Sequence, residues 1–268
     1  MKIERWFPPE NLLDDQIKVL VVGAGGTGSQ VAQGLAPLHG ALIALGHPKG
    51  LDVTLMDPSK VREANIGRQP YYSADVGQPK AHALATRINA QYSSQGFTMA
   101  SVVTGDIEHI ACSQFRRYDF IISCVDTKAA RSTIHQITRS SRSLIWLDTG
   151  NRADDGQVVM GVCEDRNGVT IPTVADLYPE IIDLSVPDDN APSCSVEEAL
   201  AKQSLFVNRE IALHALDMLS RFLRAGLTHH ARIINLAQGK MNSIPLDPQV
   251  WAAMGYRHPS LDTQKLAA

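Results

Sequence analysis

Features that would point to a membrane, secreted or zinc-stabilised protein are missing from this chain. Its 268 residues include four cysteines, and no two of them form a C-x-x-C pair. We therefore expect neither a disulfide framework nor a cysteine-based zinc site, but reduced thiols in a cytoplasm. No apolar run reaches the roughly 18 residues that a membrane-spanning helix needs. The N-terminus also lacks the apolar core of a signal peptide.

Charge is close to balanced. The formal net charge of −3 gives no electrostatic reason to bind nucleic acid or an anionic membrane. With 44% hydrophobic residues, the chain can form a sizeable core. Its length suits one large α/β domain. We therefore expect a single domain over residues 1–268, with a core at 17–163 and a C-terminal part at 164–268.

The first 163 residues alternate between strand-like and helix-like patterns. Short apolar, β-branched runs predict strands at 17–22, 51–57, 98–103, 119–125, 143–148 and 156–163. Helical patterns lie between several of them, at 27–38, 79–92 and 128–139. This alternation indicates a Rossmann-like α/β fold, doubly wound around a mostly parallel sheet.

A different pattern follows residue 164. Residues 169–194 are rich in Pro and Asp and predict a loop that crosses the surface, whereas 39–50 resembles an inserted connection. Apolar residues from Val196 to Phe222 recur at helical spacing and predict a long helix. The apolar face of this helix could cover the sheet or form a dimer interface. Residues 231–246 predict a closing hairpin.

The stretch VLVVGAGGTGS places glycines between a buried strand and a helix. Gly23, Gly25 and Gly28 fit the pattern G-x-G-x-x-G, and Gly26 adds a fourth glycine. Small residues let the backbone approach phosphate oxygens, and the start of a helix offers unpaired N–H groups. The pattern predicts a nucleotide site. The alternative is a tight strand–helix turn whose glycines serve close packing.

Asp57 closes the second predicted strand. A carboxylate at this position can accept hydrogen bonds from ribose hydroxyls. The alternative is a turn aspartate before Pro58, because Asp-Pro is a common turn pair. With these residues alone, an enzyme that binds NAD and an enzyme that cleaves ATP fit equally well.

The polar loop at 57–80 separates these two possibilities. Cleavage of ATP between its α- and β-phosphates builds negative charge on the leaving pyrophosphate, and fixed cations stabilise that charge. Arg68 and Lys80 could supply them, and Asn65 could donate its amide to the nucleotide. The alternatives are solvated surface charges for Arg68 and Lys80, and a turn residue for Asn65.

Three motifs together resemble the ThiF/MoeB and ubiquitin-activating adenylation family: GAGGTGS, D-x(7)-N-x-x-RQ and D-x-G-x-PKA. The second and third are supplied by Asp57, Asn65, Arg68, Gln69, Asp75, Gly77, Pro79, Lys80 and Ala81. The resemblance covers about residues 17–246. It implies that ATP and Mg²⁺ bind this chain. The magnesium-associated aspartate would be Asp126, for which a helix N-cap is the alternative role.

The resemblance also implies an activity. The chain would adenylate the C-terminal carboxylate of a small ubiquitin-like or sulfur-carrier-like protein with a flexible tail, and would release pyrophosphate. A homodimer is expected from the family. The implied nucleotide-binding residues are Gly23, Gly25, Gly26, Gly28, Asp57, Asn65, Arg68, Gln69 and Lys80. The implied catalytic residues are Arg68, Lys80, Asp126 and Cys194.

The C-terminal half, with PSCSVEEAL, FVNRE and NLAQGK, resembles the ThiF-like proteins of PRTRC systems. Cys194 would then be a thiol that takes the acyl group, or else an inert loop cysteine, since Glu197 and Glu198 oppose a thiolate. The other three cysteines lie in helix or strand patterns and are expected in the core: Cys112, Cys124 and Cys163. Arg5 is the one N-terminal candidate for a residue that reaches a partner subunit.

Two other functions remain open from the sequence. An NAD(P)-dependent oxidoreductase would use the glycines and Asp57 but leaves the loop at 65–80 without a role. A non-catalytic nucleotide-binding scaffold for a ubiquitin-like partner would explain the weak surroundings of Cys194, but Arg68, Lys80 and Asp126 argue against it.

Overall fold

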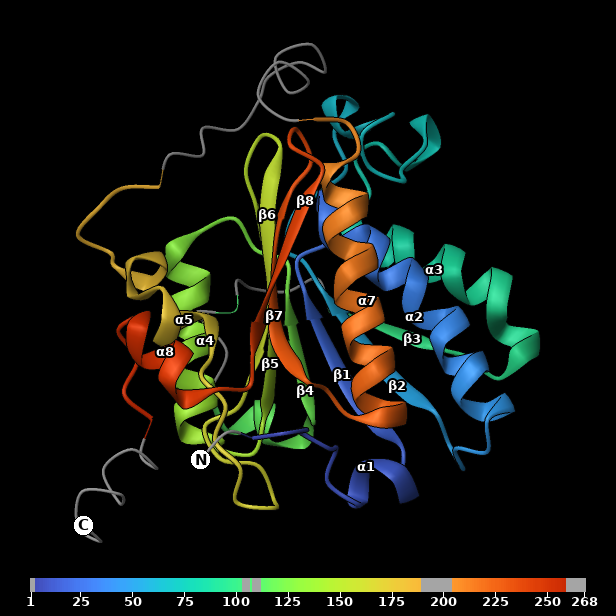
Figure 1. Cartoon of the computed structure of the whole chain (residues 1–268). Helices are drawn as coiled ribbons and strands as arrows, with labels where there is room; N and C mark the ends of the chain where they lie inside the picture. The colour runs from blue at the N-terminus through green and yellow to red at the C-terminus, as the bar shows by residue number, and fades with distance from the viewer. Residues whose placement is uncertain (1–2, 103–106, 108–111, 189–203, 259–268) are drawn as a thin grey trace, which may run out of the picture.

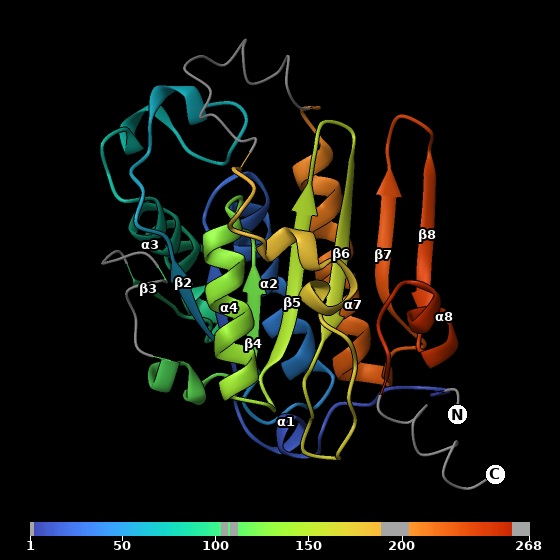
Figure 2. The ribbon, with the colours of Figure 1, turned by 90° about the vertical axis from the view of Figure 1, so that its left-hand side faces the viewer.

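A computed structural model describes residues 3–102, 107, 112–188 and 204–258. Within these residues an eight-stranded sheet forms the centre of the molecule, with helices on both faces (Figures 1 and 2). The strands are β1 Ile17–Val22, β2 Leu51–Met56, β3 Met99–Val102, β4 Phe120–Ser123, β5 Ile145–Asn151, β6 Asp155–Gly161, β7 His229–Asn235 and β8 Lys240–Pro245. Their order across the sheet is β3-β2-β1-β4-β5-β6-β7-β8.

Strands β1 to β5 pair in parallel, and β6, β7 and β8 continue the sheet in antiparallel fashion. The inner strands are short apolar runs because helices cover both of their faces. The Rossmann-like, mostly parallel α/β fold predicted from the sequence is therefore confirmed, and so is the C-terminal hairpin, which is formed by β7 and β8.

The α-helices are α1 Asn11–Asp14, α2 Gly26–Ala44, α3 Lys80–Tyr92, α4 Lys128–Ser140, α5 Val174–Leu177, α7 Val207–Ala225 and α8 Pro248–Ala253. Short 3₁₀ helices are η1 Glu63–Asn65, η2 Ser73–Asp75, η3 Ser93–Gln95, η5 Cys112–Arg117 and η6 Pro179–Ile182. Helices α2, α3 and α7 lie on one face of the sheet, and α4, α5 and α8 lie on the other (Figure 1).

The apolar face of α7 packs against α2 and the sheet. Ile211 and Ala215 are buried there, and Leu216 lies so close to Gly34 that a Cβ on the glycine would be 2.1 Å from Cδ1 of Leu216. Covering the sheet, one of the two roles expected for this helix, is thus the one observed. Its start is later than predicted, at Val207, and Val196 lies outside the described residues.

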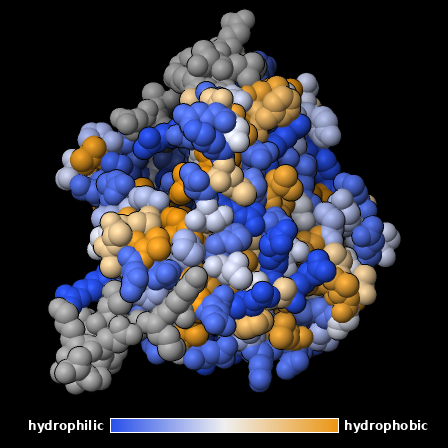
Figure 3. All heavy atoms as spheres, in the orientation of Figure 1, coloured by the Kyte–Doolittle hydropathy of each residue, from blue (hydrophilic) through white to orange (hydrophobic). Residues whose placement is uncertain are grey.

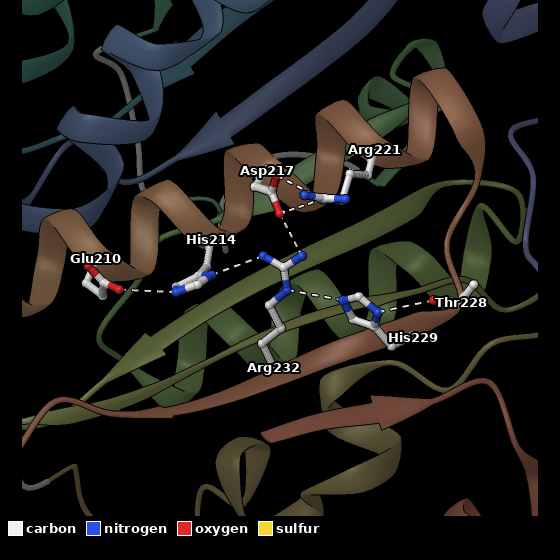
Figure 4. A network of polar contacts seen from close by, with 7 residues as sticks. All are labelled: Glu210, His214, Asp217, Arg221, Thr228, His229 and Arg232. Carbon is white, nitrogen blue, oxygen red and sulfur yellow. Dashed lines mark hydrogen bonds and ion pairs between the residues drawn. The ribbon is translucent and has the colours of Figure 1, made fainter. Parts of the chain in front are cut away.

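Polar contacts around Arg232 also join α7 to β7 (Figure 4). Arg232 is buried, with 5% of the residue exposed. Its guanidinium nitrogens lie 2.7 Å from a carboxylate oxygen of Asp217, 3.0 Å from Nδ1 of His214 and 3.2 Å from Nε2 of His229. Because a buried charge without partners would be costly, this network is what allows Arg232 to lie between helix and sheet.

One prediction for the N-terminal half is wrong. Residues 39–50 do not form only a connection, since α2 continues through Pro37 to Ala44. His39 and Leu42 are buried on the core side of this extension, and Nδ1 of His39 accepts a hydrogen bond of 3.0 Å from the N–H of Leu51. These contacts offset the backbone hydrogen bond that a proline inside a helix cannot make.

The segment after residue 164 is also more ordered than a surface loop. Ile171 pairs with Val162 in an isolated bridge, and α5 and η6 follow. Val174 and Leu177, both in α5, are buried. Burial of these apolar side chains holds the segment against the core. The many prolines and aspartates of 169–194 had predicted a loop instead.

The face that carries α2 and α7 shows apolar residues scattered among polar ones (Figure 3). Phe206 and Leu213 are examples, with 58% and 60% of each residue exposed. Among the described helices, none is long and apolar enough to cross a membrane.

Candidate active site

The chain winds away from β1 and β4 in opposite directions, towards β2 and towards β5, so these neighbouring strands form the switch point of the sheet. Ligands of doubly wound folds bind outside the carboxyl ends of the strands at this point. The glycine-rich turn, residues 23–28, follows β1, and Asp126 follows β4. The fold therefore brings the two predicted segments to one edge of the sheet.

The glycines of the turn serve two different purposes. Gly23 has a φ of +95°, and a Cβ there would lie 2.5 Å from the carbonyl oxygen of Cys124. A Cβ on Gly28 would lie 1.9 Å from the carbonyl oxygen of Gly23. These two positions need glycine for packing, as the alternative interpretation held. A Cβ on Gly25 would meet nothing within 4 Å, so space for a ligand lies beside this residue.

Gly25 is also the N-cap of α2. It has no side chain that could satisfy the first N–H groups of the helix, which leaves them available to an anion. An open position at an uncapped helix start is the arrangement expected for a phosphate site.

Asp57 lies directly under this turn and is 6% exposed. One carboxylate oxygen accepts a hydrogen bond of 2.6 Å from the N–H of Ala24, and the other accepts one of 2.7 Å from the N–H of Ser59. Asp57 is therefore a turn residue and also fixes the glycine-rich turn. Each oxygen keeps a second lone pair, so a ribose contact stays a prediction.

Tyr71 supports the same turn and was not identified from the sequence. Its hydroxyl donates a hydrogen bond of 2.7 Å to the carbonyl oxygen of Ala24. Burial raises the pKa of this phenol, and the nearby charge of Asp57 adds to the effect. No sequence signal distinguishes Tyr71 from its exposed neighbour Tyr72, because only the folded loop buries one of them.

The loop after β2 returns to the turn through backbone pairing. The N–H of Lys80 donates to the carbonyl oxygen of Ser59 at 2.9 Å, and the N–H of Val61 donates to that of Gln78 at 2.8 Å. These bonds place the first residue of α3 beside the end of β2. Lys80 is 7% exposed there.

The electrostatic surroundings of Lys80 show which charges lie close to it. Burial lowers the pKa of the Lys80 ammonium, the negative charges of Asp57 and Asp126 raise it, and the positive charges of Arg62 and Arg68 lower it. Since Asp57 also holds the glycine-rich turn, both predicted cations lie on the same side of the molecule as that turn. Arg62 was not predicted, since an exposed arginine has no distinguishing pattern.

Arg68 is itself partly buried, and burial lowers the pKa of its guanidinium. The loop that carries it is organised by Asn65, whose Oδ1 accepts a hydrogen bond of 2.9 Å from the N–H of Arg62. The carbonyl oxygen of Asn65 accepts one of 2.9 Å from the N–H of Gln69. Among the described residues no non-glycine residue has a positive φ, so Asn65 holds the loop without the left-handed backbone that turn asparagines tolerate.

Gln69 has a buried side-chain oxygen with no hydrogen-bond partner among the described residues. A buried acceptor without a donor is unfavourable. A donor group on a ligand would remove this penalty.

Asp126 is exposed between β4 and α4. The N-cap of α4 is Thr127, whose hydroxyl accepts a hydrogen bond of 3.3 Å from the N–H of Ala130. The N-cap role considered for Asp126 is therefore wrong. Within the described residues no group of three or more His, Cys, Asp and Glu side chains could hold a metal ion. Mg²⁺ can bind through a single carboxylate with phosphates and water, so Asp126 fits a nucleotide-borne magnesium ion.

The segment that follows η6 is described as far as residue 188, and it ends beside the start of α4. The N–H of Lys128 lies 3.1 Å from a carboxylate oxygen of Asp188, and Nζ of Lys128 lies 3.0 Å from the carbonyl oxygen of Val186. Cys194, the predicted nucleophile, lies outside the described residues.

Two of the other cysteines can be assessed. Burial raises the pKa of Cys124, which lies under the glycine-rich turn, to about 12, and it also raises the pKa of the buried Cys163. Neither thiol fits a nucleophile at neutral pH. The side chain of Cys112 lies outside the described residues. Arg5 donates a hydrogen bond of 2.9 Å to the carbonyl oxygen of Ala225, at the end of α7 away from the turn.

Comparisons with known proteins show the family and the fold of this chain. A model of the ThiF family matches residues 10–251. The chain is 25% identical to the NEDD8-activating enzyme E1 catalytic subunit of Schizosaccharomyces pombe over 184 residues, which are 67% of this chain and 36% of that protein. It is 30% identical to the adenylyltransferase and sulfurtransferase UBA4 of Yarrowia lipolytica over 118 residues, which are 44% of this chain and 27% of that protein.

Among solved structures, Escherichia coli MccB with ATP aligns with a TM-score of 0.57 at 14% identity, over 93% of this chain and 67% of that one. PaaA aligns with a TM-score of 0.58 at 17% identity, over 86% of this chain and 73% of that one. These alignments show that the fold is shared. The chain spans only about a third of the curated enzymes that it matches.

Proposed function

The chain belongs to the ThiF family, and from this we propose that it adenylates the C-terminal carboxylate of a small ubiquitin-like or sulfur-carrier-like protein. ATP is the second substrate and pyrophosphate is released. The observation that supports this proposal most directly is the convergence of the Lys80, Arg68, Asp57 and Asp126 charges next to the open position at Gly25. A dehydrogenase has no use for the two cations, Lys80 and Arg68, in this position.

The phosphates of ATP would lie at the start of α2, with its N–H groups pointing towards them. Asp57 would accept hydrogen bonds from the ribose, and the free oxygen of Gln69 would accept one from the nucleotide. Asn65 would donate from its side-chain NH₂ group to the nucleotide, because its side-chain oxygen already accepts the Arg62 N–H and holds the loop.

The reaction needs no general base, because a C-terminal carboxylate with a pKa of about 3.3–3.7 is already ionised at neutral pH. One of its oxygens forms a bond to the α-phosphorus of ATP. The bond between that phosphorus and the oxygen leading to the β-phosphate breaks, and pyrophosphate departs with the electron pair. Lys80 and Arg68 stabilise the negative charge that builds on the leaving group.

Magnesium would be held at Asp126 together with the phosphates, where it neutralises part of the same charge. The catalytic contribution of the protein is otherwise alignment of the two substrates. The described thiols do not take part, and transfer of the acyl group to Cys194 is a separate proposal.

The identity of the protein substrate is a finer proposal than family membership supports. The resemblance of the C-terminal half to ThiF-like proteins of PRTRC systems supports a small ubiquitin-like protein with a flexible tail as the acyl donor. A homodimer is proposed on the family resemblance alone, because the apolar face of α7 packs inside the chain.

Exchange of labelled pyrophosphate into ATP tests the activity, with a ubiquitin-like protein supplied and then withheld. We expect Lys80→Ala to lower exchange by about 10²–10³-fold, the usual loss when one group that stabilises transition-state charge is removed. Lys49→Ala is a matched control, since Lys49 is exposed and pairs with Asp15 on the surface, and it should exchange like the parent.

Because Lys80 is buried, its substitution could also destabilise the fold, so the melting temperature of the variant is measured in parallel. Arg68→Ala is a second test, since it removes a positive charge at a less buried position. Near-parental exchange in both variants would contradict the assignment. A parent that binds ATP but shows no exchange with any carboxylate partner would indicate a non-catalytic scaffold instead.

A further inference from the structure

Three polar side chains from distant parts of the chain meet at the start of α2. Thr27 is the second residue of that helix, Asn151 ends β5 and Asn208 is the second residue of α7. The Thr27 hydroxyl lies 3.0 Å from Oδ1 of Asn208 and 3.2 Å from Oδ1 of Asn151, and Nδ2 of Asn151 lies 3.3 Å from Oδ1 of Asn208. This cluster connects α2, β5 and α7 at the place where the phosphate site was predicted.

Asn208 also lies against the backbone of the turn. A Cβ on Gly26 would be 2.6 Å from both Cγ and Oδ1 of Asn208 and 2.7 Å from its Nδ2. Gly26 is therefore required by the close approach of Asn208, whereas Gly25 alone opens to free space. Asn208 contacts the turn in two ways, through the Thr27 hydroxyl and against Gly26.

The attachment of α7 to α2 does not depend on this contact. Leu216 packs on Gly34 further along both helices, and the N–H of Ser204 donates to the carbonyl oxygen of Ala153 at 2.9 Å just before α7. The helix would remain docked without the Asn208 side chain. What the side chain adds is a restraint on the first turn of α2.

We propose that Asn208 is a positioning residue of the nucleotide site: it holds Thr27 and Gly26 so that the N–H groups at the start of α2 face the phosphates. The inference rests on the proposed function, because it assumes that ATP binds at this turn. Contacts between these N–H groups and phosphate oxygens exist before and during the reaction. Loss of the restraint should therefore raise the KM for ATP more than it lowers kcat.

The test is titration of MgATP into the Asn208→Ala variant by calorimetry, with KM and kcat from pyrophosphate exchange. We expect the Kd for MgATP to rise about tenfold, with kcat within about threefold of the parent. Leu216→Ala is the matched control, since it weakens α2–α7 packing away from the turn. It should lower the melting temperature and leave the Kd within about twofold.

Thr27 supplies a conservative comparison. Thr27→Val removes the hydroxyl at nearly constant shape and should raise the Kd in the same way, whereas Thr27→Ser keeps the hydroxyl and should bind MgATP like the parent. An unchanged Kd in Asn208→Ala, or an equal rise in Leu216→Ala, would overturn the proposal.

The geometry can be checked without nucleotide. Gly26→Ala should lower the melting temperature because its methyl group meets Asn208, and the double variant Gly26→Ala/Asn208→Ala should recover part of that loss. Absence of recovery would contradict the contact. If the parent fails to bind MgATP, the proposed function fails together with this inference. If the parent binds MgATP and the Asn208→Ala variant binds it with the same Kd, this inference fails and the proposed function stands.

Discussion

Individual side chains at the site owe their properties to burial. The pKa of Lys80 is lowered chiefly because its ammonium is buried, and two carboxylates oppose this effect. Asp57 uses both oxygens to hold backbone N–H groups. A substitution at either position therefore removes a charge and also disturbs the turn, which is why exposed or isosteric controls are needed to interpret such variants.

His230 shows the effect of burial on stability most clearly. It is fully buried in β7, its Nδ1 lies 3.2 Å from the carbonyl oxygen of Met160, and its ring meets Trp251 edge-on. Burial lowers its pKa from 6.5 to about 4. The folded protein thus keeps His230 neutral over a pH range in which the unfolded chain binds a proton.

The sign of the pH dependence follows from this difference. As pH falls from 7 to 4, the unfolded state gains the proton first, so the free energy of unfolding should drop by about 3 kcal/mol through His230 alone. Urea unfolding at several pH values should show this extra loss in the parent relative to His230→Phe. Parallel pH profiles for the two proteins would contradict the prediction.

At the scale of elements, the carboxylate of Asp217 joins α7 to β7 through its ion pair with Arg232. Burial alone would raise the pKa of Asp217, but hydrogen bonds from Arg221 and Arg232 outweigh it and lower the pKa. The two arginines differ in surroundings: the Arg232 side chain is 7% exposed and the Arg221 side chain is 63% exposed. The same carboxylate therefore makes one buried and one surface ion pair.

Two variants should separate these pairs, because Asp217→Asn weakens both of them and Arg221→Ala removes only the surface pair. We expect Asp217→Asn to lower the free energy of unfolding by about 2 kcal/mol, since it weakens a charge-assisted bond to a buried guanidinium. Arg221→Ala should cost only about 0.5 kcal/mol, as exposed helical pairs do. Urea unfolding at pH 7 measures both values, and equal losses would show that the buried pair contributes nothing beyond a surface contact.

At the scale of the described molecule, the sheet brings the charged residues of the candidate site to one end. The glycine-rich turn, Lys80 and Asp126 come from three different strand–helix connections, yet all lie at the carboxyl ends of β1, β2 or β4 or close to them. A parallel sheet produces this arrangement because every connection after a strand starts at the same edge. The site is thus a property of the topology as much as of its residues.

A ligand that binds only this assembled site should stabilise the fold as a unit. At a concentration of about 100 Kd, MgATP should add about 2.7 kcal/mol to the free energy of unfolding, which corresponds to a rise in melting temperature of roughly 5–10 °C for a domain of this size. NAD at the same concentration should give little change. A larger shift with NAD than with MgATP would favour an oxidoreductase.

Local patterns were sufficient for much of the fold. Apolar runs predicted strands β1 to β6 within a few residues, most clearly β1, β2 and β4, whose residues are almost all buried. The C-terminal hairpin was also predicted, although most residues of β8 are exposed. The extension of α2 from His39 to Ala44 was missed, because its stability comes from burial of His39 and Leu42 against other elements. The placement of Arg68 and Lys80 on the side of the glycine-rich turn agrees with the sequence motifs, while their catalytic roles stay predictions.

Sequence by itself determined the parallel sheet, the glycine-rich turn and the family, since these depend on residues close together in the chain or at fixed spacings. Three-dimensional packing decided which residues support the turn. Tyr71 meets Ala24 across 47 positions, and Thr27 meets Asn151 and Asn208 across 124 and 181 positions. No spacing rule relates such residues, because they become neighbours only when the sheet and helices pack together.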